Sequence, residues 1–232
     1  MRVAVVEQHS FISDQLSAGT VVLDLGMNVG GFAKIVNARY GARVMGVEPV
    51  AEYAKLVRQA GFEVLKAAVA GEAGKITLHV HPTHGGSVVE TVGGMERVAV
   101  EVPAVTLDDV FRHYDLDVVD LVKMDIEGAE LAVLEHVSPR TLARIKQITV
   151  EFHAFLNPEQ RARIEMITAR LERLGFASLD FSNARFTDVL FVNRSRIPLS
   201  RVQRYDLLLR YKYARGALRA SLRHAQARLS QA

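Results

Sequence analysis

The chain has 232 residues, of which 49% are hydrophobic and 24% are charged, and it contains no cysteine. This composition predicts one globular domain with a sizeable core and a short appendage, and it excludes an intrinsically disordered chain. The absence of cysteine excludes disulfides, thiolate metal sites and a cysteine nucleophile. Residues 1–10 lack the apolar core of a signal peptide and no run of about 18 apolar residues occurs, so we expect a cytoplasmic protein.

Charged residues divide the chain into an acidic body and a basic tail. Residues 1–193 hold 19 Lys/Arg and 25 Asp/Glu, whereas residues 194–232 hold 10 Lys/Arg and one Asp. We therefore predict a domain over residues 1–196 and a basic tail over residues 197–232. Apolar residues recur near helical spacing in this tail and predict an amphipathic helix: Val202, Tyr205, Leu208, Leu209, Leu218, Leu222, Ala225 and Leu229.

Strand-like and helical patterns alternate through the acidic body. The predicted strands are Val21–Leu25, Arg43–Val47, Phe62–Leu65, Asp120–Met124, Gln147–Phe152, Phe176–Phe181 and Thr187–Val192. The predicted helices are Gly31–Tyr40, Ala51–Ala60, Ala129–His136 and Pro158–Leu174. Lys75–Val80 and Arg97–Val102 alternate polar with apolar residues and predict a small inserted β-hairpin. The alternation predicts an α/β fold with a doubly wound, mostly parallel sheet.

A glycine-rich loop follows the first strand of this sheet. Residues 24–32 read DLGMNVGGF, at the carboxyl end of a strand and just before a helix, where doubly wound sheets bind ligands. Glycine lets the backbone approach a ligand, and the helix N-terminus offers free N–H groups. Asn28 stands where a dinucleotide fingerprint has its second glycine, and no Gly-Lys-Ser/Thr follows for a P-loop. Both phosphate-binding interpretations are therefore weakened.

Two acidic residues indicate what this loop binds. Glu48 ends the second strand, where a carboxylate can accept both hydroxyls of a ribose. Asp24 ends the first strand and is expected to point into the ligand crevice, where its charge would repel a pyrophosphate and favour a cationic ligand. The pair predicts a nucleoside ligand with a positive charge.

At this point the sequence resembles the class I S-adenosylmethionine-dependent methyltransferases, and more closely the FkbM family. The matching segments are Asp24–Gly30 with Phe32, Val47–Pro49, Thr106–Asp109 and Leu121–Leu131. The run K-x-D-x-E-G-x-E at residues 123–130 is more specific than the glycine loop. The resemblance covers about residues 19–193, and it implies the Rossmann-like, seven-stranded fold of these enzymes.

The resemblance implies roles for individual residues in binding S-adenosylmethionine. Gly26, Asn28 and Gly30 would shape the methionine pocket, Glu48 would hold the ribose, and Ala68 would lie near the adenine. The remaining cofactor-binding candidates lie in or next to the matching segments: Asp24, Phe32, Pro49, Asp125 and Glu127.

Acidic residues also follow the predicted strand Asp120–Met124. Asp125 leaves the strand toward the crevice, and a carboxylate there is poorly placed for helix capping alone. Glu127 and Glu130 lie three residues apart at a helix start, so they suit either the site or stabilisation of that helix N-terminus.

The next strand ends with Glu151 and His153, which share one face by the two-residue period. Methyl transfer to a hydroxyl needs alignment of the reacting atoms and removal of the hydroxyl proton, a task that histidine suits near neutral pH. We predict His153 as the general base, with Asp125 next and Glu151 beside them. Alternatively, Asp125 and Glu151, with neighbouring oxygens or His153, bind Mg²⁺, which would orient two sugar hydroxyls and lower the pKa of the acceptor.

A second group of histidines precedes the glycine-rich segment of the inserted hairpin. His79, His81 and His84 form H-x-H-x-x-H, but no acidic residue is adjacent to complete a tetrahedral set, so a zinc site is disfavoured. By position in the family pattern, His84 and Ser87 are candidate substrate contacts.

These observations predict an S-adenosylmethionine-dependent O-methyltransferase that acts on a hydroxyl of a sugar, glycan or related natural product. The sugar preference rests on the resemblance alone. The alternative is a catalytically inactive binding or scaffold protein tethered by its basic tail. A nicotinamide dehydrogenase is disfavoured because Asn28 and Asp24 oppose pyrophosphate binding.

Three partners fit the basic tail. Its apolar seam favours packing onto the body or a second subunit, which would make a homodimer, and peripheral attachment to an anionic membrane is the next alternative. Nucleic acid is not expected as substrate, because residues 123–127 read KMDIE where an amino-methylating DNA enzyme would carry an Asn/Asp-Pro-Pro-aromatic run.

Overall fold

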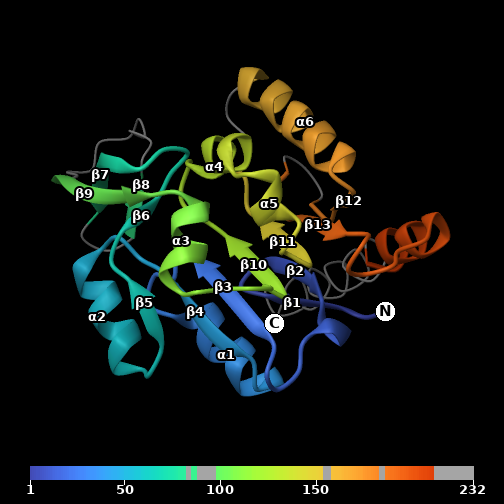
Figure 1. Cartoon of the computed structure of the whole chain (residues 1–232), viewed down its shortest axis with the longest axis horizontal. Coiled ribbons are helices and arrows are strands. Elements are labelled where there is room, and N and C mark those ends of the chain that lie inside the picture. The colour runs from blue at the N-terminus through green and yellow to red at the C-terminus, as the bar shows by residue number, and fades with distance from the viewer. Residues whose placement is uncertain (82–84, 88–97, 154–157, 183–185, 212–232) are drawn as a thin grey trace, which may run out of the picture.

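A mostly parallel seven-stranded sheet forms the centre of the protein, as predicted. The computed structural model describes residues 1–81, 85–87, 98–153, 158–182 and 186–211. The sheet has the order β12-β13-β11-β10-β3-β4-β5 (Figure 1). Its strands are β3 (Val21–Leu25), β4 (Arg43–Val47), β5 (Glu63–Leu65), β10 (Leu121–Met124), β11 (Gln147–Val150), β12 (Phe176–Asp180) and β13 (Val189–Asn193). The five strands from β11 to β5 are parallel, and β13 pairs antiparallel with both of its neighbours.

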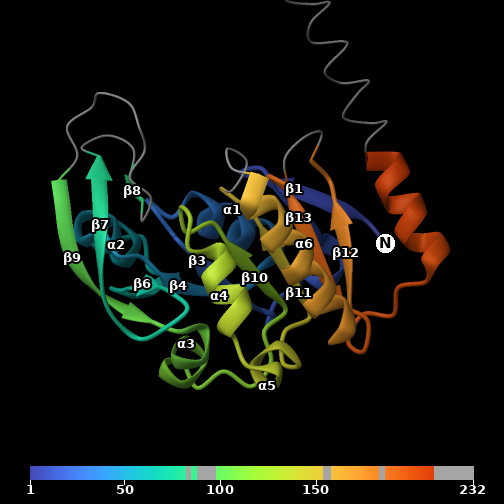
Figure 2. The same ribbon diagram turned by 90° about the horizontal axis from the view of Figure 1, so that it is seen from above.

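Helices cover both faces of the sheet and make a three-layer sandwich (Figure 2). One face packs against α3 (Leu107–His113), α4 (Glu130–His136) and α6 (Pro158–Arg173), with the short α5 (Pro139–Leu142) beside them. The other face packs against α1 (Gly31–Tyr40) and α2 (Ala51–Gln59). The strands are short and buried on both faces, which is why their sequences read as continuous apolar runs.

The inserted segment is larger than the predicted hairpin. It forms a second sheet with the order β6-β9-β7-β8, made of β6 (Ala68–Val69), β7 (Gly74–His81), β8 (Gly85–Ser87) and β9 (Val98–Val105). The expected antiparallel pair is present as β7 and β9, from Gly74 opposite Ala104 to Val80 opposite Val98. The prediction missed β6 and β8 because two or three residues carry too little pattern to identify a strand.

An N-terminal hairpin, which the sequence did not predict, lies against the central sheet. It consists of β1 (Val3–Val6) and β2 (His9–Ile12) and is followed by a 3₁₀ turn, Ser13–Gln15. Gln147 of β11 accepts a hydrogen bond from the Ile12 backbone N–H at 2.9 Å and donates one to the Ile12 carbonyl at 3.2 Å. Asp188 accepts from the Ser10 N–H at 2.9 Å and from the Ser10 hydroxyl at 2.6 Å. These buried bonds fix the hairpin to the sheet.

The described start of the basic tail is a helix over residues 201–211. Its buried residue is Leu207, and the ring of Tyr211 meets Phe181 edge-on with centroids 4.7 Å apart. Of the predicted apolar seam, Leu208 is partly buried against the core, whereas Val202, Tyr205 and Leu209 are exposed. The predicted second subunit remains a prediction. The rest of the tail lies outside the described residues. Within the described part of the chain, no helix combines the length and apolar character needed to cross a bilayer.

Replacing Gln147 with Leu is expected to lower the free energy of unfolding by about 1–3 kcal/mol, because a buried N–H and a buried carbonyl of Ile12 lose their partner. Denaturant titration measures this change. Replacing the exposed Gln59 with Leu is the matched control and should leave stability within about 0.5 kcal/mol of the original. Equal stability of the two variants would mean that the Gln147 bonds do not hold the hairpin.

Candidate active site

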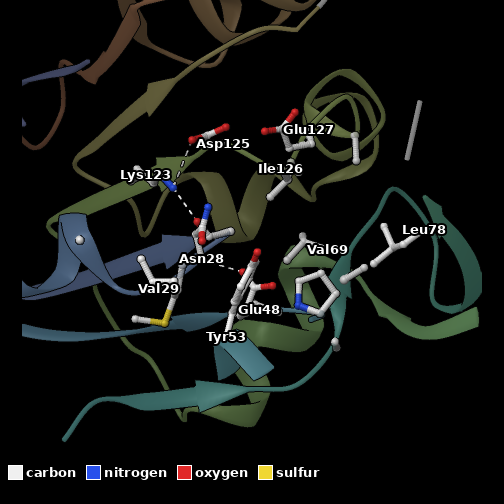
Figure 3. A pocket seen from close by; sticks show the side chains of 18 of the residues that line it. Asn28, Val29, Glu48, Tyr53, Val69, Leu78, Lys123, Asp125, Ile126 and Glu127 are labelled. Atoms are coloured by element: carbon white, nitrogen blue, oxygen red, sulfur yellow. Dashed lines mark hydrogen bonds and ion pairs between the residues drawn. The ribbon is translucent and has the colours of Figure 1, made fainter. Parts of the chain in front are cut away.

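A pocket opens at the carboxyl ends of β3, β4 and β10 (Figure 3). Asn28, Lys123 and Asp125 lie at its polar end, while Val69 and Leu78 lie at its apolar end. Most of the predicted cofactor-binding residues line it: Gly26, Asn28, Glu48, Pro49, Ala68, Asp125 and Glu127. The site therefore forms where the crevice of a doubly wound sheet was expected.

The loop after β3 requires glycine at two positions. Gly26 and Gly30 have φ of 80° and 79°, a region that residues with a Cβ rarely adopt. A Cβ at Gly26 would also collide with the carbonyl oxygen of Asp125. Gly30 does not line the pocket, because it caps the start of α1, and Phe32 is a buried core residue behind the loop. The structure thus gives Gly30 and Phe32 supporting positions instead of the predicted cofactor contacts.

Glu48 lines the pocket and also holds its walls together. Its Oε2 accepts a hydrogen bond from the Asn28 N–H at 2.7 Å, and its Oε1 accepts one from the Val50 N–H at 2.8 Å. Burial raises the pKa of Glu48 to about 7, although these two bonds oppose the shift. A carboxylate with this pKa changes charge within the physiological pH range.

Asp24 does not point into the crevice, which corrects the prediction. Its side chain is fully buried, with 0% exposed, and its Oδ1 lies 3.2 Å from Nζ of Lys123. Lys123 also donates a 2.7 Å hydrogen bond to the Gly26 carbonyl. Burial disfavours the ammonium, but Asp24 and Asp125 outweigh it and raise the pKa of Lys123. Asp24 therefore balances the charge of the buried Lys123, and Lys123 rather than Asp24 lines the pocket.

Asp125 lies among three basic side chains. Its Oδ2 is 3.6 Å from Nζ of Lys123 and 3.7 Å from Nε2 of His9. Its Oδ1 is 3.7 Å from Nε2 of His153. Burial disfavours the carboxylate, but these neighbours outweigh it and keep the pKa of Asp125 below its ordinary value. Asp125 is therefore ionised at neutral pH.

Glu130 does not cap α4, whose N-cap is Ala129 without a side-chain bond, but it contacts both the turn before this helix and His153. Its Oε1 accepts hydrogen bonds from the Ile126 and Gly128 N–H groups, each at 3.1 Å, at the start of α4. The same oxygen lies 2.9 Å from Nδ1 of His153. Glu127 has a φ of 52° and lines the pocket, with Oε2 3.6 Å from Nε2 of His153. Glu130 thus fixes both the turn and the histidine ring.

The protonation state of His153 differs from the neutral imidazole that the predicted general base requires. Burial lowers the pKa of His153, but the hydrogen bond and charge of Glu130, with Glu127 and Asp125, outweigh burial and raise this pKa to about 9. In the ligand-free protein His153 is therefore an imidazolium at neutral pH. A general base needs the free imidazole.

Two groups of residues in the described part of the chain have the composition and spacing of a metal site. Asp125 and Glu151, the predicted magnesium ligands, form one with His9, and Asp125, Glu130 and His153 form the other. In each group one ligand atom per residue lies within 4.8 Å of the others. Burial and the neighbouring Asp125 raise the pKa of Glu151. His79 belongs to neither group.

Several site residues escaped the sequence analysis. Glu7 lines the pocket and His9 reaches Asp125, but both come from the unpredicted hairpin, and no local pattern marks them. Lys123 was identifiable from the sequence as a site candidate, because a lysine inside a buried strand needs a carboxylate partner. His84 lies outside the described residues, and so does the side chain of Ser87, so their predicted substrate contacts remain predictions.

Comparison with known proteins identifies the family. The methyltransferase FkbM domain matches residues 24–178. Methyltransferase sdnD of Sordaria araneosa is 26% identical over 183 residues, which cover 62% of this chain and 70% of sdnD.

Two solved structures are similar to this chain at low sequence identity. SMU.1697c of Streptococcus mutans, solved in complex with SAH, has a TM-score of 0.47 and 8% identity over 78% of this chain and 92% of its own. An rRNA methylase from Streptococcus thermophilus has a TM-score of 0.45 and 11% identity over 78% and 90%, respectively. The family match spans most of the central sheet and the whole glycine loop, so the chain belongs to the FkbM methyltransferase domain family.

Proposed function

We propose that this methyltransferase transfers the methyl group of S-adenosylmethionine to a hydroxyl of a sugar, glycan or related natural product. The observation that carries the proposal is that Glu48 and Asp125 line the same pocket, and that Asp125 lies in a cluster of titratable groups with Glu151 and His153. Glu48 can hold a nucleoside through its ribose, and the cluster around Asp125 can receive a proton. The choice of a sugar hydroxyl rests on the FkbM resemblance.

The pocket lining suits a nucleoside with a charged, amino-acid-like end. Glu48 lines the pocket with a buried carboxylate, whose oxygens have lone pairs left beyond the Asn28 and Val50 bonds to accept the ribose hydroxyls. Ala68 and Val69 lie on the apolar side with Leu78, which suits a purine ring. At the other end, Gly26 and Asn28 bring backbone groups close to the site where a methionine moiety would lie.

The reaction is a displacement at the methyl carbon. A lone pair of the acceptor oxygen forms the new C–O bond as the C–S bond breaks, and the sulfur keeps the bonding pair and leaves as S-adenosylhomocysteine. The carboxylates around the site favour the cationic donor over its neutral thioether product. The chain's task is therefore to align the acceptor and to take its proton.

We assign His153 as the group that accepts the proton of the acceptor hydroxyl, with Asp125 and Glu151 beside it. The ligand-free chain holds His153 as an imidazolium, so the ring must release its proton before it acts. A sulfonium bound beside it would favour this release, because a nearby positive charge lowers the pKa of a cationic acid. Glu130 keeps Nδ1 engaged and leaves Nε2 directed at the Asp125 and Glu127 side.

Calorimetric titration with S-adenosylmethionine and S-adenosylhomocysteine tests the donor, with NAD as the control ligand. Binding of the first two alone supports the proposal. Transfer of a radiolabelled methyl group to a panel of sugars and glycans then tests the acceptor. Cofactor binding without transfer to any acceptor would favour the catalytically inactive binding protein instead.

Replacing Glu48 with Gln is expected to weaken binding of S-adenosylhomocysteine by about 10- to 100-fold, because a charged hydrogen-bond acceptor is lost. The original protein should bind this ligand more tightly as the pH rises from 6 to 8, since the pKa of Glu48 is about 7 and ribose hydroxyls prefer the ionised carboxylate. The amide of the Glu48→Gln variant cannot ionise, so this pH dependence should vanish. Calorimetry measures both effects, and Glu52→Gln on the exposed face of α2 is the control. An unchanged affinity would remove the ribose assignment.

Replacing His153 with Gln is expected to lower turnover by about 10²-fold or more while S-adenosylhomocysteine affinity stays near its original value, because the group that accepts the proton is lost. Turnover is measured with the acceptor found in the panel. His136→Gln, at a histidine on α4 that lies away from the pocket, should retain full turnover. Full turnover in the His153 variant would rule out this residue as the base.

A further inference from the structure

His9 is a buried histidine whose ring nitrogens have no hydrogen-bond partner among the described residues. Its side chain is 1% exposed, and the ring meets Phe32 edge-on with centroids 5.9 Å apart. Burying an imidazole without any hydrogen bond is unfavourable, so the arrangement requires an explanation. The hydrogen bonds of Ser10 and Ile12 to the sheet hold β2 in place and keep this ring beside the site.

His9 is directed at a pair of carboxylates. Its Nε2 lies 3.7 Å from Oδ2 of Asp125, which is too far for a hydrogen bond. One ligand atom each of His9, Asp125 and Glu151 lies within 4.8 Å of the other two. Asp125 and Glu151 follow β10 and β11, which are adjacent parallel strands joined at this edge by the bond from the Glu151 N–H to the Met124 carbonyl. One possible ligand atom from each of three segments therefore lies close enough to the other two to bind the same ion.

We infer that His9, Asp125 and Glu151 bind one divalent transition-metal ion. An imidazole nitrogen with two carboxylate oxygens suits ions such as Mn²⁺, Fe²⁺, Co²⁺ and Zn²⁺, whereas Mg²⁺ prefers oxygen ligands and bound water. His9 therefore favours a transition-metal ion over the Mg²⁺ that was predicted at Asp125 and Glu151. The ion would give the buried nitrogen of His9 its missing partner.

Lys123 is the main electrostatic argument against a cation here, because its Nζ lies 3.6 Å from the same Oδ2 of Asp125. However, Lys123 is already matched by Asp24 at 3.2 Å and by the Gly26 carbonyl at 2.7 Å. His153 also lies 3.7 Å from Asp125, but Glu130 at 2.9 Å and Glu127 at 3.6 Å balance its charge. The charges of Asp125 and Glu151 therefore remain to balance the ion. The second group with metal-site spacing is the weaker candidate, because Glu130 Oε1 already serves two backbone N–H groups and His153.

The role of the ion rests on the proposed function. An ion at this edge lies next to the pocket through Asp125, where it would hold the acceptor oxygen and favour loss of its proton. Metal binding itself is measured without donor or acceptor. Failure of this inference is therefore distinguishable from failure of the methyl-transfer proposal, which calorimetry with S-adenosylhomocysteine tests separately.

The test uses the full chain, stripped with a chelator and titrated with Co²⁺ and Mn²⁺. We expect one ion per chain, a visible absorption band of protein-bound Co²⁺, and coupling of bound Mn²⁺ to a histidine nitrogen in pulsed electron paramagnetic resonance. His9→Gln should remove this nitrogen coupling and weaken binding at least about tenfold. Glu151→Gln should weaken binding similarly and keep the coupling.

His136→Gln is the matched control and should bind as the original does, because this ring contacts the Ala132 carbonyl away from the site. Thermal unfolding of each variant confirms that it is folded, and Glu151→Gln provides the test if His9→Gln is not. Three results would overturn the inference: no binding of either ion at millimolar concentration, unchanged binding in both site variants, or nitrogen coupling that survives in His9→Gln and disappears in His153→Gln.

Discussion

The buried ion pair between Asp24 and Lys123 is the constraint on which the site depends. A lysine inside a parallel sheet is costly unless it is paired, and here its ammonium lies 3.2 Å from Asp24 and 3.6 Å from Asp125 while it donates to the Gly26 carbonyl. One side chain of β10 therefore connects the end of β3, the glycine loop and the first acidic residue of the site. The position of Asp125 between Lys123, His9 and His153 follows from this connection.

The fold was readable from the sequence because its evidence is local. Most strands of the central sheet are short apolar runs, and long helices have a recognisable start or stop, such as the left-handed Gly41 that ends α1 with an N–H bond to the Asn37 carbonyl. The site was readable only in part. Residues at strand ends meet at one edge of any parallel sheet, which brought Asp125 together with Glu151 and His153 and placed Glu48 in the same pocket as Asp125. The orientation of Asp24 and the arrival of Glu7 and His9 depend on contacts between distant segments, which no local pattern encodes.

Segments that resemble the family also include residues that build the frame instead of the pocket. Thr106 and Asp109 form a capping box at the start of α3, where each side chain accepts the other's backbone N–H. Asp108 accepts hydrogen bonds from the Ser138 N–H and hydroxyl and from the Thr141 hydroxyl, so it joins α3 to α5. A match to the family motifs therefore includes residues that stabilise the fold as well as residues that line the pocket. Only the contacts of each residue show which of the two roles it has.

The N-terminal hairpin makes part of the site separable from the rest of the domain. Glu7 and His9 precede residues 24–178, the span that matches the family, yet one lines the pocket and the other reaches Asp125. The hairpin is a two-stranded sheet of its own, held to the central sheet by side-chain hydrogen bonds, so exchanging it between relatives leaves the strand order of the central sheet unchanged. Exchange of this one segment would thus alter the chemistry beside the pocket while the glycine loop and its buried lysine stayed unchanged.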